Sequence, residues 1–470
     1  MSSRIIPIVP APTVAMDEKI QARSISGRFT RWRWAMVWLT QLGYYGLPWL
    51  NLNGRQALLF DLQADRFFLF GAVLYPQDLI YLAGLLVISA LLLFFVTTLA
   101  GRLWCGFACP QTVYTELFQW IEHRLEGDRQ SRLRLDRSRW NVHKLARRGG
   151  KHLAWAVLGL WTGFTLVGYF TPIRELALAV PFGLGPWEAF WIGFYGLATY
   201  GNAGFLREKV CQHMCPYGRF QGSMMDANTL YVAYDERRGE PRAPRPRGSD
   251  PVQRGNGACV DCTLCVQVCP VGIDIRQGLQ AACISCGLCI DACNQVMDKL
   301  RSPRGLIRMA SESELASPGN TVMRLRDHLG RRRVLVYGGL LIAATAFMTA
   351  SFVDRPTLRL NAVRDRAVLA RQVDNGAAEN VYRLQLMNAS EQARDVWVDV
   401  TGADGLRIAQ PTLVHLAPAA AHMQTVTVHL AAEQALALAG QIIPIRLGIA
   451  EAGDHAHERA ETASTFMVPR

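Results

Sequence analysis

At 470 residues the chain is longer than one ordinary domain, so we expect two or three folded units. Hydrophobic residues make up 50% of the chain and charged residues 19%, a mixture that fits apolar membrane segments joined to polar domains. The net charge of +12 would suit a nucleic-acid partner, but Lys and Arg of membrane proteins gather in cytoplasmic loops, so we expect no nucleic acid among the partners.

Five apolar stretches are each long enough to cross a bilayer core, which takes about 20 helical residues. They predict an α-helical transmembrane bundle of five spans, approximately Trp34–Leu52, Leu79–Thr98, Leu153–Phe170, Trp187–Leu206 and Val334–Val353. More than thirty residues precede the first span and no small-residue cleavage site follows its apolar core, so we expect a retained span and not a signal peptide.

Positive charge predicts which loops face the cytoplasm. Basic residues precede the first span and follow the second: Arg4, Lys19, Arg23, Arg28, Arg31, Arg33, then Arg124, Arg129, Arg132, Arg134, Arg137, Arg139, Lys144, Arg147, Arg148 and Lys151. The positive-inside rule makes both segments cytoplasmic. The short loops around Asp61 and around Arg174 and Glu175 lack such an excess, so they belong to the opposite face, and five crossings place the C-terminus outside.

The twelve cysteines all lie between Cys105 and Cys293, which indicates metal ligation in a reducing compartment more than disulfides. The motif CxxxCP occurs twice, as Cys105-Gly-Phe-Ala-Cys109-Pro110 after the second span and as Cys211-Gln-His-Met-Cys215-Pro216 after the fourth. Each pair of cysteines either shares a helix face or lies in a loop that ends at a helix start, because proline disfavours helix before it and suits a first helical turn. A helix start would also lower a thiol pKa.

Thiolates are soft ligands that bind Cu(I), zinc and iron–sulfur species. We predict that Cys105, Cys109, Cys211 and Cys215 form one functional site at the cytoplasmic membrane surface, with copper as the proposed metal and buried structural thiols as the alternative. His213 and Met214 lie inside the second motif, and packing or exposure is the simpler interpretation of both.

A Pro- and Arg-rich segment at 237–256 predicts an extended linker to a small domain that holds two cysteine runs. Their CxxCxxCxxxC spacing is typical of ferredoxins with two [4Fe-4S] clusters, in which the fourth cysteine of each run binds the other cluster. We therefore assign to cluster I Cys259, Cys262, Cys265 and Cys293, and to cluster II Cys269, Cys283, Cys286 and Cys289. Zinc is the alternative, but zinc sites rarely repeat a run of four cysteines.

From Asp354 to Arg470 the hydrophobic pattern alternates with a period of two, as in Val396-Trp-Val-Asp-Val and Thr425-Val-Thr-Val-His-Leu. This alternation predicts an all-β immunoglobulin-like sandwich without a disulfide, since it contains no cysteine. It is either a periplasmic docking surface or a stable exported cap.

The expected fold class is a multi-domain membrane protein: a five-span helical bundle with a small bacterial-type two-[4Fe-4S] ferredoxin insert and a C-terminal sandwich. The expected domains are a cytoplasmic N-terminal segment 1–33, a four-span membrane domain 34–236, the linker 237–256, the ferredoxin domain 257–300, a basic cytoplasmic connector 301–333, the fifth transmembrane helix 334–353 and the periplasmic sandwich 354–470.

Taken together, these motifs resemble the cytochrome c oxidase accessory proteins, the family called CcoG, FixG or RdxA. The resemblance covers nearly the whole chain and implies a protein of the bacterial inner membrane that reduces Cu(II) to Cu(I) in the cytoplasm and assists assembly of cbb3-type cytochrome oxidase. It implies copper contacts at the four catalytic CxxxCP cysteines and cluster ligands at the eight ferredoxin cysteines. Implied partners are membrane lipid, a cytoplasmic or membrane electron donor, a copper carrier or transporter, and cbb3-type oxidase subunits.

Two other functions fit the same motifs. The first is a quinol-oxidising electron conduit that resembles the membrane subunits of nitrate or nitrous oxide reduction, which also pair CxxxCP motifs with two clusters. The exported sandwich and the lack of a flavin domain weigh against it. The second is an oxidase assembly scaffold, in which the clusters serve only the structure.

Overall fold

The computed structural model describes residues 20–317, 325–364, 370–373, 376–452 and 459–470. Arg4 and Lys19, two of the residues expected on the cytoplasmic side, lie outside the described residues. The chain divides into two compact units, Met1–Leu50 with Ala83–Ala346 and Asn51–Leu82 with Phe347–Arg470. We call them the ferredoxin unit and the sandwich unit.

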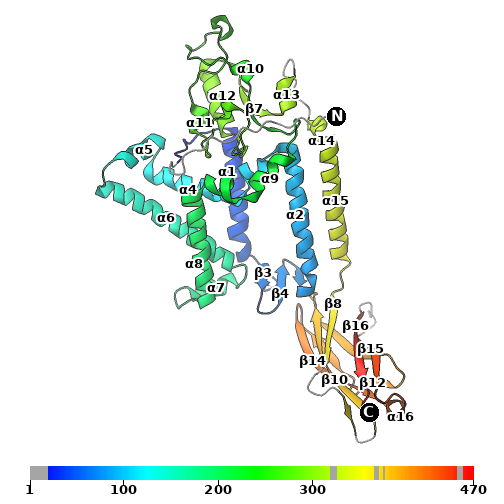
Figure 1. The fold of residues 1–470 in the computed structure, drawn as a ribbon. Helices are drawn as coiled ribbons and strands as arrows, with labels where there is room; N and C mark the ends of the chain where they lie inside the picture. Colours follow the sequence, from blue (N-terminus) through cyan, green and yellow to red (C-terminus); the bar gives the residue numbers. More distant parts are fainter. Residues whose placement is uncertain (1–19, 318–324, 365–369, 374–375, 453–458) are drawn as a thin grey trace. The chain divides into compact units, whose positions relative to one another are not determined.

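The ferredoxin unit is mostly helical (Figure 1). Its helices are α1 (Arg28–Gly46), α2 (Leu79–Ala100, which begins in the sandwich unit), α3 (Leu103–Phe107), α4 (Pro110–Glu126), α5 (Arg129–Arg137), α6 (Val142–Val167), α7 (Ile173–Ala179), α8 (Pro186–Gly201), α9 (Pro216–Met224), α10 (Glu236–Gly239), α11 (Leu264–Gln267), α12 (Leu288–Leu300), α13 (Glu312–Ala316), α14 (Leu325–Leu329) and α15 (Arg332–Val353, which ends in the sandwich unit). Its two strands are β6 (Tyr231–Tyr234) and β7 (Ile307–Ala310), which pair antiparallel.

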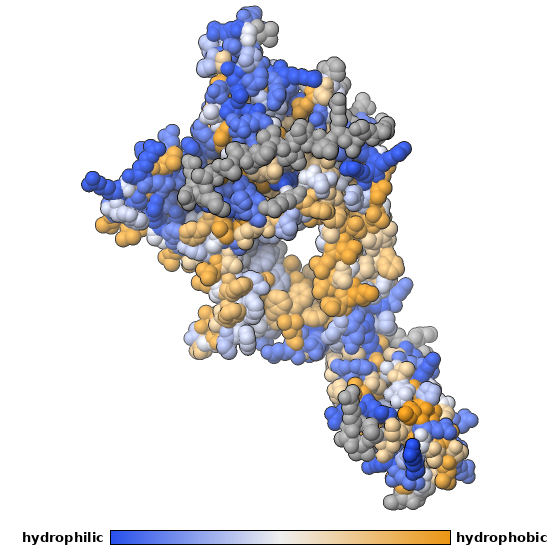
Figure 2. All heavy atoms as spheres, in the orientation of Figure 1, coloured by the Kyte–Doolittle hydropathy of each residue, from blue (hydrophilic) through white to orange (hydrophobic). Residues whose placement is uncertain are grey.

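Two described helices are long and apolar enough to cross a membrane: Pro76–Ala100, which contains α2, and α15. They correspond to the second and fifth expected spans. Both expose large apolar side chains, among them Leu86 on α2 and Ile342 on α15, and Figure 2 shows hydrophobic residues gathered over these helices. Such surfaces fit lipid better than water, because lipid does not penalise exposed apolar area.

The other three expected spans coincide with α1, α6 and α8 but differ from them at the ends. Helix α1 ends at Gly46, because Pro48 follows, and Leu52 lies in a strand instead of a helix. Helix α6 begins at Val142 and includes a charged first part, while α8 has only 16 residues before a π-helical turn, Asn202–Leu206. The structure therefore shows two spans of the expected five, and the five-span bundle stays a prediction.

Helices α6 and α8 nevertheless pack as membrane helices do. A Cβ added at Gly159 would lie 2.7 Å from the carbonyl oxygen of Gly196, so only glycine permits this approach of the two backbones. Gly163, four residues further along α6, faces Ile192 and Gly196 in the same way. A Gly-x-x-x-Gly contact of this kind is characteristic of helix pairs in lipid.

The ferredoxin region extends beyond the expected 257–300, because β6 and β7 flank it and contribute to its core. Val232, Leu306 and Ile307 pack with the cysteine-bearing loops. The segment 237–256, expected to be an extended linker, packs along this region: Gly257 donates its backbone N–H to Pro241 at 2.8 Å, and Gly248 donates to Leu300 at 3.2 Å. The segment 237–256 is therefore a loop packed on the ferredoxin region and not a free linker.

The sandwich unit contains two antiparallel sheets, as the alternating pattern predicts. Their strands are β8 (Leu358–Arg364), β9 (Arg371–Gln372), β10 (Ala378–Asn388), β11 (Arg394–Thr401), β12 (Leu406–Ile408), β13 (Leu413–Leu416), β14 (Ala421–Leu430), β15 (Ile442–Glu451) and β16 (Arg459–Met467), with a short helix α16 (Ala432–Ala437). One sheet has the order β12-β14-β10-β8, with β9 beside β10, and the other β13-β11-β15-β16. Leu384, Leu447 and Phe466 are fully buried between them.

The segment expected to be a short loop around Asp61 has a fold of its own. It contains the paired strands β1 (Asn51–Leu52) and β2 (Arg55–Gln56) and the meander β3 (Leu58–Asp61), β4 (Arg66–Leu69) and β5 (Ala72–Leu74). Within the sandwich unit, Tyr75 donates its hydroxyl to the carbonyl oxygen of Asn388 at 3.1 Å, and Arg359 pairs with Asp78 at 2.5 Å. The meander therefore completes the C-terminal domain.

Candidate iron–sulfur and thiol site

The four cysteines assigned to cluster I lie around one cavity, beside Tyr234, Arg276 and Ile307. Asp261 and Thr263 adopt the left-handed conformation, which turns the loop between Cys259 and Cys265; these two cysteines are buried, whereas Cys262 is exposed. Burial raises the pKa of Cys265 to about 11, and burial together with the other thiols of the group raises the pKa of Cys293 to about 12. Four convergent thiols fit an iron–sulfur cluster, which binds them as thiolates.

The four cysteines assigned to cluster II form a second group against the first turn of α12. Cys269, Cys283, Cys286 and Cys289 pack among Val268, Ile284 and Leu288. Burial raises the pKa of Cys269 to about 12 and that of Cys283 to about 11. Burial also raises the pKa of Cys289 well above its usual value, and the neighbouring thiols Cys286, Cys283 and Cys269 add to the shift. Iron would replace these protons, since metal binding to thiols releases them.

The two CxxxCP motifs have the loop form. Cys109 and Cys215 are both extended and stand directly before α4 and α9, and each of these helices begins with the proline of its motif. Cys105 lies in α3, and Cys211 in a π-helical turn, Val210–Met214. The structure brings the two motifs together: burial and, to a smaller extent, the neighbouring thiols Cys109, Cys105 and Cys215 raise the pKa of Cys211 to about 12.

The expected lowering of a thiol pKa at these helix starts is wrong for Cys109. The backbone N–H groups of Gln111 and Thr112 do favour its thiolate, but burial outweighs them and raises the pKa. Burial likewise raises the pKa of Cys105 to about 11. Cys105 and Cys109 are therefore protonated at neutral pH unless a cation binds them.

His213 and Met214 are exposed, in line with the simpler interpretation of both. Among the described residues, no group of three or more His, Cys, Asp or Glu side chains is arranged to hold a single metal ion. Copper at the CxxxCP cysteines accordingly stays a proposal.

Two polar residues next to this thiol site were not predicted from the sequence. Gln221 of α9 is fully buried and places its side-chain amide 3.5 Å from Cys105 Sγ. Arg102, also buried, donates to the backbone carbonyls of Ala281 and Gly218, and so ties the loop of cluster II to α9. Nothing in the local sequence distinguishes Gln221, inside α9, or Arg102, at the start of α3, from an ordinary helix residue.

A close backbone contact joins the thiol site to the loop of cluster II. A Cβ added at Gly106 would lie 2.6 Å from the carbonyl oxygen of Ile284 and 2.9 Å from Cys286 Cα. Only glycine allows this approach. Cys105, its neighbour in sequence, packs into the same apolar cluster as Cys269, Cys283 and Cys289. The first CxxxCP motif therefore rests directly on residues assigned to cluster II.

The N-terminal part of the chain also contacts the ferredoxin region. Arg23 donates its backbone N–H to Gln267 at 2.8 Å. Asp291 of α12 accepts the backbone N–H of Thr30 at 2.9 Å and so caps α1. Arg33 pairs with Glu116 at 2.8 Å. The described part of the expected N-terminal segment 1–33 is thus part of the ferredoxin unit.

Two sets of clustered thiols on a ferredoxin scaffold, together with two candidate membrane-spanning helices, define the class as iron–sulfur oxidoreductases of the membrane. Three family models match: "4Fe-4S binding domain" at 82–127, "4Fe-4S dicluster domain" at 206–312 and "IG-like fold at C-terminal of FixG", whose description also names an oxidoreductase, at 348–469.

The chain is 37% identical over 425 residues to the nitrogen fixation protein FixG of Rhizobium meliloti, covering 84% of this chain and 81% of that one. It is 38% identical over 406 residues to the protein RdxA of Cereibacter sphaeroides, covering 84% and 85%. A crystal structure of a FixG-related protein from Vibrio parahaemolyticus superposes with a TM-score of 0.21 at 18% identity, over 24% of this chain and 97% of that one. The chain belongs to the FixG/RdxA family.

Proposed function

We propose that this iron–sulfur oxidoreductase is a cupric reductase of the bacterial inner membrane, which makes Cu(I) on the cytoplasmic side for assembly of cbb3-type cytochrome oxidase. The observation that supports it most is the contact of Gly106 with Ile284 and Cys286, because its neighbour Cys105 packs in the same apolar cluster as the cysteines assigned to cluster II. When bound, the two [4Fe-4S] clusters supply single electrons, and reduction of one Cu(II) takes one.

The residues of the thiol site suit that reaction. Thiolates select Cu(I), so Cys105, Cys109, Cys211 and Cys215 would stabilise the product ion more than the substrate ion. Gln221 holds Cys105 in place from α9. The Arg102 guanidinium lies close enough to lower the pKa of both Cys105 and Cys211, against the larger effect of burial, and so offsets part of the negative charge of the thiolates.

Release of Cu(I) requires a partner. We propose a copper carrier or transporter as the acceptor, and membrane lipid around α2 and α15. The sandwich unit would lie in the periplasm and contact oxidase subunits. The meander at 58–74 supports this topology, because it packs with the sandwich while its flanking helix α2 and the helix α15 before the sandwich are the two candidate spans. Both segments then share one side of the membrane.

A single-turnover experiment tests the proposal. Purified protein, its clusters reduced anaerobically and the reductant removed, is mixed with Cu(II), and loss of the reduced-cluster EPR signal is compared with Cu(I) formed. We expect one Cu(I) for each electron lost. Replacement of Cys105, Cys109, Cys211 and Cys215 by alanine should abolish the reaction with iron content unchanged, whereas Ser223→Ala, exposed on α9, should leave it intact. Copper reduction that survives the fourfold replacement would refute the site.

Iron content also separates copper from a third cluster at the same thiols, since the "4Fe-4S binding domain" model spans Cys105 and Cys109. Two clusters require about eight irons per chain, and a third raises this to about twelve. Loss of about four irons in the fourfold alanine variant would assign the CxxxCP cysteines to iron.

A further inference from the structure

A second cavity lies on the ferredoxin unit, outside the cysteine sites. It has a volume of about 270 Å³. Its lining comes from α5, α6 and the turn after α8, and includes Arg148, His152, Phe205, Arg207 and Glu208. Charged residues of α6 end at Lys151, and apolar residues begin at Leu153. The cavity therefore stands where α6 changes from a polar to an apolar helix.

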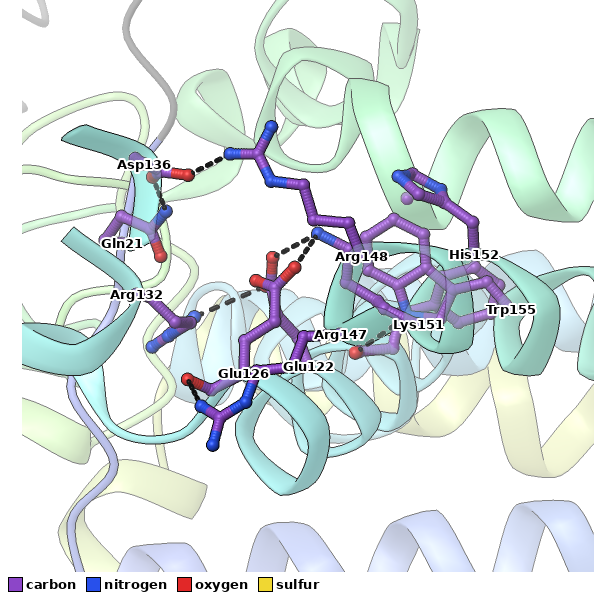
Figure 3. A network of polar contacts seen from close by, with 12 residues as sticks. Gln21, Glu122, Glu126, Arg132, Asp136, Arg147, Arg148, Lys151, His152 and Trp155 are labelled. Atoms are coloured by element: carbon purple, nitrogen blue, oxygen red, sulfur yellow. Dashed lines mark hydrogen bonds and ion pairs between the residues drawn. The ribbon is translucent and has the colours of Figure 1, made fainter. Parts of the chain in front are cut away.

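The base of the cavity is a buried ionic network, drawn in part in Figure 3. Glu122, with no exposed surface, contacts Arg207 at 3.0 Å, Arg132 at 3.3 Å and Lys151 at 3.5 Å, and Lys151 also contacts Glu126 at 2.7 Å. The carboxylates balance most of the cations, so this network offers little net charge to a ligand. It fixes the positions of Lys151 and Arg207 instead.

One wall is aromatic. The His152 ring stacks on Phe205 with an interplanar angle of 15° and a centroid distance of 5.9 Å, and its Nδ1 lies 2.9 Å from the Tyr200 hydroxyl. Trp155 lies beneath, edge-on to His152. Such a wall suits a flat ring, because offset and edge-on aromatic contacts contribute beyond the area they bury.

Two hydrogen-bond donors of the lining have no partner among the described residues. Arg207 is 4% exposed, yet its Nη1 makes no hydrogen bond. Arg148 pairs with Asp136, but its buried Nε is also without a partner. A buried donor without an acceptor costs about 1–3 kcal/mol, so a ligand oxygen would relieve this cost. Glu208 provides an acceptor, and burial raises the pKa of its carboxyl group.

We propose that this cavity binds the headgroup of a membrane quinol and that the quinol is the electron donor of the protein. A quinol is a flat, neutral ring with two oxygens on an apolar tail, which matches the aromatic wall, the two unpartnered donors and the boundary on α6. An anionic lipid headgroup has the same access, and the basic lining residues Arg148, Lys151, Arg207 and Lys209 do not exclude it, but it offers no flat ring to the aromatic wall. The proposal rests on the proposed function for its final electron acceptor.

The chemistry balances. When a quinol becomes a quinone, both O–H bonds break, and two protons and two electrons leave. Glu208 and His152 would take the protons and pass them to water, while the electrons leave singly, as two one-electron clusters require. Two Cu(II) ions then consume the electrons of one quinol. Arg207 and Glu208 also line a smaller cavity with Cys211, Pro270 and Ile284, so the quinol would bind next to the thiol site and the loop of cluster II.

The test uses full-length protein with both clusters, oxidised, in nanodiscs made from neutral lipid. It is mixed anaerobically with decylubiquinol, and cluster reduction is followed by absorbance and EPR. We expect saturable reduction. Glu208→Gln should slow it by about tenfold or more, the scale expected for loss of a proton acceptor, and His152→Gln should raise the half-saturating quinol concentration. Reduction by dithionite and reoxidation by Cu(II) should not change in either variant. Glu236→Gln, an exposed substitution on α10, is the control.

Three outcomes would overturn the inference: no cluster reduction by quinol, equal reduction in the wild type and both variants, or an anionic phospholipid that copurifies with the wild type and is lost from the variants. The outcomes for the two proposals are separable. If quinol fails but dithionite-reduced protein still reduces Cu(II), the cupric reductase stands alone. If quinol reduces the clusters and Cu(II) does not reoxidise them, the quinol site stands and the copper assignment fails.

Discussion

Gly106 is the residue at which the two cysteine systems meet. Gly106→Ala should push Ile284 and Cys286 away, because the contacted atoms are backbone and cannot rotate aside. We expect the free energy of unfolding to fall by about 1–3 kcal/mol, the usual cost of overpacking, and reoxidation of the reduced clusters by Cu(II) to slow severalfold in stopped-flow measurements.

The matched control is Gly149→Ala on α6, where an added Cβ has nothing within 4 Å and should gain about 0.5–1 kcal/mol from helix propensity. If Cu(II) reoxidises the clusters of Gly106→Ala at the wild-type rate, the contact of Gly106 with Ile284 and Cys286 has no role in electron transfer.

Glu122 is a buried carboxylate that contacts three buried cations. Glu122→Gln keeps its volume but removes its charge and leaves Arg132, Lys151 and Arg207 buried with less compensation. We expect a loss of about 3–5 kcal/mol in the free energy of unfolding, measured by denaturant titration, as for other broken buried ion pairs. Glu236→Gln, exposed on α10, should stay within about 0.5 kcal/mol of the wild type. A small effect at Glu122 would mean that the network is hydrated.

At the scale of elements, the meander β3-β4-β5 and the sandwich are held by the buried hydroxyl of Tyr75, which donates to Asn388 and Ala420. Tyr75→Phe leaves two carbonyl groups without this donor, so the sandwich unit should lose about 1–3 kcal/mol of stability. Thermal unfolding followed by near-UV circular dichroism measures it. Tyr195→Phe, on an exposed face of α8, is the control, and equal melting of both variants would show that the meander docks without this bond.

Local sequence patterns predicted several elements well. Alternation in the C-terminal segment gave the strands β10, β11, β14 and β15, because the side-chain period of a strand is a property of its own residues. The cysteines assigned to cluster I line one cavity and those assigned to cluster II pack in one apolar cluster, while the ligand assignment itself stays a prediction. The proline after Cys109 and Cys215 left two forms for each motif, a continuous helix or a loop that ends at a helix start. The structure has the second form at both motifs.

Contacts between distant segments were not predictable in this way. Three contacts join residues far apart in the chain: Gly106 with Cys286, Arg102 with Ala281, and Glu122 with Arg207. No local sequence period predicts them. The ends of three expected spans differ from those of α1, α6 and α8 for the same reason. Hydropathy finds apolar residues, whereas Pro48 and the π-helical turn after α8 determine where those helices end.

At the scale of the whole molecule, the two compact units should unfold separately. The ferredoxin unit contains all twelve cysteines, so removal of iron by an anaerobic chelator should lower its melting temperature, because binding energy of a metal centre is folding energy. The sandwich unit has no cysteine, so its melting temperature should not change. Differential scanning calorimetry with and without chelator measures both transitions, and a common shift would show that the units unfold as one.

The pairing of the meander with the sandwich has a consequence for synthesis. The ribosome makes residues 58–74 early, but their partners Met387, Ala389 and Ala419 emerge only about three hundred residues later. The side chains of Leu59, Phe68 and Val73 thus stay exposed while the rest of the nascent chain is translated. In this state they can aggregate or bind chaperones. A stop codon between Cys293 and β10 would leave the meander permanently without its packing partners in the sandwich, even though all twelve cysteines would be present.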